Sequence, residues 1–175
     1  MAQGMRFTGG ANVNPTIEMD DVTYVIPLAT PGAYVTNKCN SRVVKTAAAT
    51  LTADESGALC IFNAAAGFTY TLPAAVTGLW FEFLVTVTAT SSVHRIACAT
   101  GDFLLGAILQ SPDSTDAVAR RAADGTADLA WEGNGTTTGG YIGDWVRVTA
   151  ISGTQWVIQG LNTATGTEAT PIKTT

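Results

Sequence analysis

Apolar side chains recur with a period of two residues along much of this 175-residue chain. In the segment FEFLVTVT, residues 81–88, this period places four apolar side chains on one face of an extended strand. Those side chains belong to Phe81, Phe83, Val85 and Val87. No segment sustains the apolar stripe of an amphipathic helix, and only DSTDAVARRAA, residues 113–123, has some helical propensity. The sequence therefore predicts an all-β fold.

Turn signals divide the chain into short strands. Residues 145–152 and 155–162 are rich in aromatic and β-branched residues, which predicts a hairpin joined by Ser152, Gly153 and Thr154. Asp124-Gly125 is expected to turn residues 117–123 back into 126–133, and the glycine-rich stretch 133–140 is expected to form a flexible loop. Further strands are predicted at 22–28, 58–63, 68–72, 93–99 and 103–110. This spacing is typical of an antiparallel β-sandwich, jelly roll or small barrel.

The chain is long enough to bury one core, and it begins with a segment of different character. Residues 1–21 mix glycine, asparagine and proline with isolated apolar residues, a composition too broken for an independent helix. We predict an extended N-terminal arm over 1–21 and a single β domain over 22–175. Such an arm orders on binding to a partner strand, and the alternative is a disordered terminus. The candidate partner contacts are Met5, Phe7, Val13 and Ile17.

The stretch LTADESGALCIFNAAAGFTYTLP, residues 51–73, contains two carboxylates and a thiol. Thr52 and Glu55 have capping-box spacing, which predicts one helical turn that Gly57 ends in a left-handed conformation. Asp54 and Glu55 are then turn and cap residues and not a catalytic pair. A strand, ALCIFN, is expected to follow, and AAAG, residues 64–67, is expected to turn it back into the strand FTYTLP. In this second strand, the side chains expected on one face are those of Phe68, Tyr70 and Leu72.

Charged residues make up 13% of the chain, about half the usual share of roughly a quarter. Part of the exterior is therefore expected to be covered by other protein subunits. The formal net charge is −5 and the basic residues are scattered, so nucleic acid is not an expected partner. No apolar run approaches the roughly 20 residues of a membrane span, and no signal peptide is evident, which predicts a protein made and kept in a cytoplasm.

Few residues are candidates for catalysis or metal binding. Cys39, Cys60 and Cys98 lack CxxC spacing, so we expect reduced, packed thiols. His94 is the only histidine, and a Ser-His-Asp or Cys-His mechanism has to use it. It shares a strand face with Ile96 and Cys98. His94 and Cys98 together would be half of a zinc site, but no second pair has matching spacing. We predict no catalytic, cofactor or metal site and interpret His94 as a structural or interface residue.

The loop aspartates lack the D-x-D-x-D-G spacing of a calcium loop, so at most an incidental ion is expected at any of them: Asp20, Asp21, Asp113, Asp116, Asp124 and Asp128. The four tryptophans would stack on sugars if exposed: Trp80, Trp131, Trp145 and Trp156. At strand positions, however, tryptophans are more often core or interface anchors. Arg120 and Arg121 are expected to be a solvated or interface pair, and residues 133–140 lack the lysine and helix of a phosphate loop.

Residues 50–110 resemble a family of small bacteriophage virion proteins. The resemblance rests on a turn, LTAD, before a hairpin that ends in TLP, then a glycine-aromatic strand, TGLWFEFLV, and a glycine-rich strand, ATGDFLLGAI. Proteins of this kind decorate the outside of capsids or form head and tail fibres, usually as trimers, with an N-terminal segment attaching and the β domain exposed. The family supplies no catalytic residues.

The resemblance implies a nonenzymatic capsid decoration (cement) protein of a tailed phage, made in the host bacterial cytoplasm and located on the outer capsid surface of the virion. Its expected partners are two further copies of itself and the major capsid protein, with Met5, Phe7, Val13 and Ile17 as capsid contacts; no cofactor, nucleic acid or membrane is expected. The alternative is a fibre or tail-tip module that binds host carbohydrate. A distant third is a glycan-processing enzyme, which needs two carboxylates roughly 5 to 10 Å apart across a groove.

Overall fold

The computed structural model describes residues 6–8, 16–19, 22–25, 43–112 and 117–175. The chain divides into two compact units, Met1–Ser41 and Arg42–Thr175. In the first unit, strands β1 (Arg6–Thr8), β2 (Thr16–Met19) and β3 (Val22–Val25) form an antiparallel sheet in the order β1-β2-β3. The predicted boundary after residue 21 falls inside this sheet, because β3 is paired with β2.

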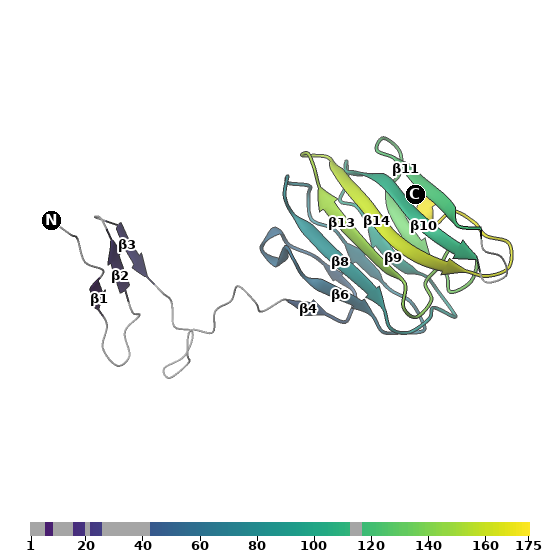
Figure 1. Ribbon diagram of the computed structural model, residues 1–175, viewed down its shortest axis with the longest axis horizontal. Coiled ribbons are helices and arrows are strands. Elements are labelled where there is room, and N and C mark those ends of the chain that lie inside the picture. The colour runs from purple at the N-terminus through teal and green to yellow at the C-terminus, as the bar shows by residue number, and fades with distance from the viewer. Residues whose placement is uncertain (1–5, 9–15, 20–21, 26–42, 113–116) are drawn as a thin grey trace. The chain divides into compact units, whose positions relative to one another are not determined.

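The second unit is a sandwich of two β-sheets (Figure 1). The larger sheet has the order β11-β10-β14-β13-β8-β6-β4 and the smaller sheet has the order β15-β12-β9-β7-β5. The larger sheet consists of β4 (Val44–Lys45), β6 (Leu59–Phe62), β8 (Trp80–Val85), β10 (Phe103–Pro112), β11 (Ala119–Asp124), β13 (Trp145–Ala150) and β14 (Gln155–Ala164). The smaller sheet consists of β5 (Ala49–Thr50), β7 (Thr69–Thr71), β9 (His94–Ala97), β12 (Ala130–Gly133) and β15 (Ile172–Lys173). The prediction of an all-β sandwich is confirmed.

Both sheets are mixed and not purely antiparallel as we predicted. From β4 to β10 the chain alternates between the larger and the smaller sheet. Each crossing reverses the direction of the chain, so the next strand in the same sheet runs the same way. The pairs β4–β6 and β6–β8 in one sheet, and β5–β7 and β7–β9 in the other, are therefore parallel.

Of the three predicted turns, one joins a hairpin and two do not. The predicted hairpin across residues 64–67 is wrong, because β6 and β7 lie in different sheets, where β6 pairs with β8 and β7 pairs with β9. The hairpin of β13 and β14 is confirmed, with Val148 opposite Ile158. The Asp124-Gly125 turn is present, and Gly125 has a φ of +81°. The predicted pairing across it is wrong, because β11 pairs with β10 while β12 pairs with β9 and β15 in the opposite sheet. This turn carries the chain from one sheet to the other.

The predicted one-turn helix is present as the 3-10 helix η2 (Ala53–Glu55). The Glu55 carboxylate accepts a hydrogen bond of 3.0 Å from the backbone N–H of Thr52 and forms an ion pair with Lys45. The hydrogen bond from Lys45 lowers the pKa of Glu55. Gly57 follows with a φ of +90°, the left-handed conformation that the sequence predicts.

The glycine-rich stretch 133–140 is packed against the sandwich in place of the predicted flexible loop. The Asn134 side-chain oxygen accepts hydrogen bonds from the backbone N–H groups of Thr136 and Thr138 at 2.9 and 3.1 Å. Gly135 has a φ of +74°, and a Cβ atom there would lie 1.7 Å from the carbonyl oxygen of Ala89. Glycine is therefore needed here for close backbone packing and not for freedom of movement.

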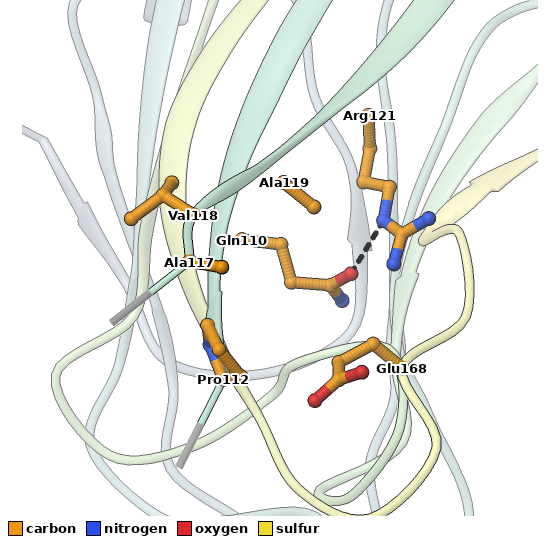
Figure 2. Close-up of a pocket in the computed structure, with 7 residues that line it drawn as sticks. All are labelled: Gln110, Pro112, Ala117, Val118, Ala119, Arg121 and Glu168. Atoms are coloured by element: carbon orange, nitrogen blue, oxygen red, sulfur yellow. Dashed lines mark hydrogen bonds between the residues drawn. The ribbon is translucent and has the colours of Figure 1, made fainter. Parts of the chain in front are cut away.

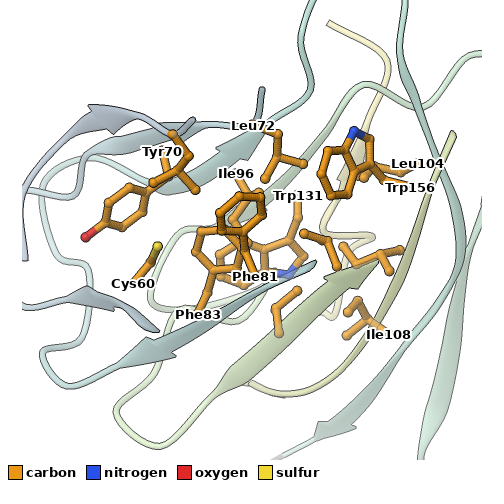
Figure 3. Packing of buried hydrophobic residues seen from close by; sticks show 14 of the residues in the cluster. Cys60, Tyr70, Leu72, Phe81, Phe83, Ile96, Leu104, Ile108, Trp131 and Trp156 are labelled. Atoms are coloured by element: carbon orange, nitrogen blue, oxygen red, sulfur yellow. The ribbon is translucent and has the colours of Figure 1, made fainter. Parts of the chain in front are cut away.

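The core lies between the two sheets and is rich in aromatic residues (Figure 3). Phe81, Phe83 and Val85 point inward from β8, as the two-residue period predicts. Val87 was predicted to join them but is 36% exposed, because β8 ends at Val85. Tyr70 and Leu72 are buried and Phe68 packs against the same cluster, which confirms the predicted face of that segment.

Candidate functional site

The predicted contacts of the N-terminal arm are only partly described. Phe7 of β1 lies directly opposite Ile17 of β2 in the antiparallel ladder. Met5 and Val13 lie outside the described residues. The structure thus makes two of the four candidates cross-strand neighbours within a small sheet, whereas we predicted a single extended segment. In the sheet order β1-β2-β3, β1 is an edge strand, the position from which strand addition to a partner takes place.

His94 is a core residue of β9. It is fully buried, its ring centroid lies 4.6 Å from that of Phe62, and its Nε2 atom lies 2.8 Å from the carbonyl oxygen of Val87. That contact requires a proton on Nε2, so Nδ1 is unprotonated in the neutral ring, and Nδ1 has no hydrogen-bond partner. Burial lowers the pKa of His94. The structure therefore holds a neutral imidazole among apolar side chains.

The zinc and catalytic interpretations of His94 receive no support from its surroundings. Cys98 packs against the core, and its burial raises the thiol pKa to about 12. Within the part of the chain that the structure describes, no group of three or more histidine, cysteine, aspartate and glutamate side chains is placed to hold a metal ion. Cys60 is buried and Cys39 lies outside the described residues.

The burial of His94 predicts a loss of stability in mild acid. Because its native pKa lies below the ordinary value of 6.5, the unfolded chain binds a proton first as the pH falls. The free energy of unfolding should therefore decrease below pH 6.5, by at most about 1.4 kcal/mol per pH unit, until the native pKa is reached. Urea titrations of the wild type and of His94→Phe at pH 7.5 and 5.5 test this. Equal pH dependence in both proteins would contradict it, since His94 is the only histidine.

The four tryptophans occupy different environments. Trp131 and Trp156 are core residues, 1% and 0% exposed. The indole N–H of Trp156 donates to the Asp102 carboxylate at 3.4 Å. The Trp80 ring is half-buried with the guanidinium of Arg147 4.3 Å from its centroid. Trp145 is 42% exposed and borders a shallow hollow of about 270 Å³. Trp145 is therefore the most accessible of the four.

The loop aspartates that are described act as turn residues. Asp124 Oδ1 accepts hydrogen bonds from the backbone N–H groups of Thr126 and Ala127 at 2.8 and 3.0 Å, which lower the pKa of Asp124. Asp128 Oδ2 accepts from the backbone N–H of Asp124 at 2.7 Å. The other four candidates lie outside the described residues: Asp20, Asp21, Asp113 and Asp116.

Arg120 and Arg121 do not form the pair that we predicted, because adjacent strand residues point to opposite faces. Arg120 is exposed, whereas Arg121 turns toward a hollow of about 220 Å³ (Figure 2). There its Nε donates to Gln110 Oε1 at 2.6 Å. The Gln110 amide in turn donates to the carbonyl oxygens of Thr137 and Ala169 at 3.2 and 3.1 Å. Every polar atom of this buried glutamine is satisfied, so it ties two loops to the edge of the sheet.

The outer face of the larger sheet, the face turned away from the smaller sheet, carries a row of apolar side chains across neighbouring strands. From β6 to β10, the consecutive cross-strand neighbours in this row are Ile61, Leu84, Trp145, Leu161 and Leu109. Trp145, Leu161 and Leu109 are 42%, 44% and 49% exposed. Leu84 and Ile61 are half-buried. We call these five residues the outer apolar row.

The outer apolar row was not predicted from the sequence. A signal for it is present in β8, where Leu84 lies between the inward residues Phe83 and Val85, and in β10, where apolar residues occupy both strand faces. A two-residue period identifies the inward face of each strand but does not tell which outward residues become neighbours. Those neighbours depend on the register between strands that are far apart in the chain.

No helix in the described residues has the length and hydropathy of a membrane span. The chain matches no protein-family model, no curated protein and no solved structure.

Proposed function

We propose that this protein is a nonenzymatic capsid decoration protein of a tailed bacteriophage, which binds the outside of the mature capsid as a homotrimer and stabilises the shell. The observation that carries the proposal is the outer apolar row, in which three large side chains are more than two-fifths exposed. Contiguous apolar surface of this kind is typical of a face that another protein covers. The low charge content and the resemblance of residues 50–110 to small virion proteins support the same interpretation.

Such a protein stabilises a shell by binding the mature lattice in preference to the lattice before expansion. A ligand that binds one state at a hundred times its Kd stabilises that state by about 2.7 kcal/mol per site. Summed over many sites, this free energy of binding favours the expanded lattice over the lattice before expansion. No proton transfer or covalent step is required, which agrees with core and turn roles for His94, Asp124 and Asp128.

The division of the chain into two units suggests separate tasks, attachment for residues 1–41 and exposure for the sandwich. Deleting residues 2–14 removes β1 and should leave the melting temperature of the sandwich unchanged, because the sandwich is a separate compact unit. The deletion should weaken binding to expanded, undecorated capsids of the parent phage by at least about tenfold, or roughly 1.4 kcal/mol. Cosedimentation of capsids with each protein measures this. Saturation with undiminished affinity would show that the sandwich alone anchors the protein.

One observation favours a second candidate, a fibre or tail-tip module that binds host carbohydrate. Trp145 is exposed beside a hollow lined by Leu59, Glu82, Phe83 and Leu84, and aromatic rings next to carboxylates suit sugar binding. Titration of host surface polysaccharide into the protein, followed by tryptophan fluorescence, tests this candidate. A saturable change that Trp145→Ala abolishes would favour it over capsid decoration.

A further inference from the structure

The two outer faces of the sandwich differ in chemistry. On the smaller sheet, Thr69 and Thr71 of β7 point away from the core, and the neighbouring strands β9 and β12 present the ion pair of Arg95 and Glu132. Such a face suits water. On the larger sheet, outward-pointing positions of five neighbouring strands hold the outer apolar row. Of the two outer faces, the face with the outer apolar row is therefore the better candidate for a surface that another protein covers.

We propose that the outer face of the larger sheet is the surface on which copies of this chain associate, so that three such faces enclose a shared apolar centre. This inference rests on the trimer of the proposed function and deepens it by naming the interface. Outer apolar rows from different copies would then bury one another, as the inner faces of the two sheets do within one copy.

The charges on this face favour a second copy over a charged partner. The outward positions of its strands hold Arg120 and Arg147 together with Glu82 and Asp124, two basic and two acidic side chains. Glu82 and Arg147 already form an ion pair across β8 and β13 at 3.7 Å. A face with balanced charge meets no net repulsion from its own copy, whereas nucleic acid or a strongly acidic protein would need an excess of basic residues.

A closed trimer requires each copy to offer two different surfaces, because a threefold interface is heterologous. The outer apolar row provides them as two halves. Ile61, Leu84 and Trp145 lie on β6, β8 and β13, and Leu161 and Leu109 lie on β14 and β10. The first half of one copy would pack against the second half of the next.

Light scattering on full-length protein at micromolar concentration tests the inference with one charge placed in the row. We expect the wild type to have the mass of three chains of 18.1 kDa and Leu161→Glu to have the mass of one. Leu161 is exposed in the single chain, so the glutamate remains hydrated there and the circular dichroism spectrum should not change. Leu109→Glu, on the neighbouring strand, should give the same threefold drop in mass and serves if Leu161→Glu fails to fold.

The matched control is Val76→Glu, because Val76 is 57% exposed and lies outside both sheets. This variant should keep the wild-type mass. A wild-type protein with the mass of one chain, or folded row variants with the wild-type mass, would overturn the inference. Capsid binding is measured separately, so a trimer that Leu161→Glu dissociates but that does not bind capsids would overturn the proposed function and leave this interface in place.

Discussion

Replacing Phe83 with alanine is expected to lower the free energy of unfolding by about 3 to 5 kcal/mol, the range for large-to-small changes in a packed core. Phe83 is 2% exposed and lies in the aromatic cluster between the sheets (Figure 3). Its ring centroid is 5.6 Å from that of Tyr70 and 6.2 Å from that of Phe62. Both neighbours are fixed by their own strands, so they would fill little of the cavity.

Thr86→Ala is the matched control for Phe83→Ala. Thr86 follows β8, is half-buried and donates its hydroxyl proton to the carbonyl oxygen of Phe62 at 3.2 Å. Its backbone N–H donates to the same oxygen at 2.9 Å and remains after the substitution, so we expect a loss of about 1 kcal/mol or less. Urea midpoints of the two variants measure the difference. Equal midpoints would mean that the inward face of β8 is assigned incorrectly.

Replacing Asp144 with alanine should be equally severe, although Asp144 lies in a loop. It is 2% exposed; Oδ2 accepts hydrogen bonds from the backbone N–H groups of Gly140 and Tyr141 at 2.8 and 3.1 Å, and Oδ1 accepts from Thr163 at 2.8 Å. Alanine would leave three buried or partly buried donors without a partner, at about 1 to 3 kcal/mol each. The substitution also removes a carboxylate whose burial is costly, since burial raises the pKa of Asp144. We therefore expect a total loss at the lower end of the summed range, about 3 to 5 kcal/mol.

Asp124→Ala is the control for Asp144→Ala, because Asp124 also accepts backbone N–H bonds but lies at an exposed turn. Water replaces the lost acceptor there, so the effect should be about 1 kcal/mol or less. Asp144→Asn should fall between the two, since its amide keeps one acceptor oxygen. Chemical denaturation of the three variants provides the comparison, and it would contradict the account if Asp144→Ala were no less stable than Asp124→Ala.

The sequence predicted the strands well because their inward faces depend only on local alternation. The period in residues 81–85, and the hairpin of β13 and β14, are both local patterns that one segment carries alone. The alternation of the chain between the sheets is not local. It makes β6 and β8 parallel neighbours with β7 in the other sheet, and nothing in the three segments themselves specifies this.

The same difference between local patterns and non-local pairing applies to His94 and to the outer apolar row. The period of β9 places His94 on the inward face with Ile96, and the structure buries both. The period of β13 also separates Trp145 from Val146 and Val148, so its exposure was available from the sequence. The neighbours of Trp145 could not be predicted from the sequence, because Leu84 and Leu161 lie beside it only through the pairing of β13 with β8 and with β14. A surface assembled from five strands needs the register of all of them.

Cryo-electron microscopy of the parent virion would distinguish capsid decoration from a place on a fibre or tail tip. We predict density for three copies of the sandwich around threefold axes on the outer surface of the mature capsid, with the larger sheets facing one another and residues 1–41 directed toward the capsid. Density for this chain on a fibre or tail tip, or its absence from the outer capsid surface, would contradict it.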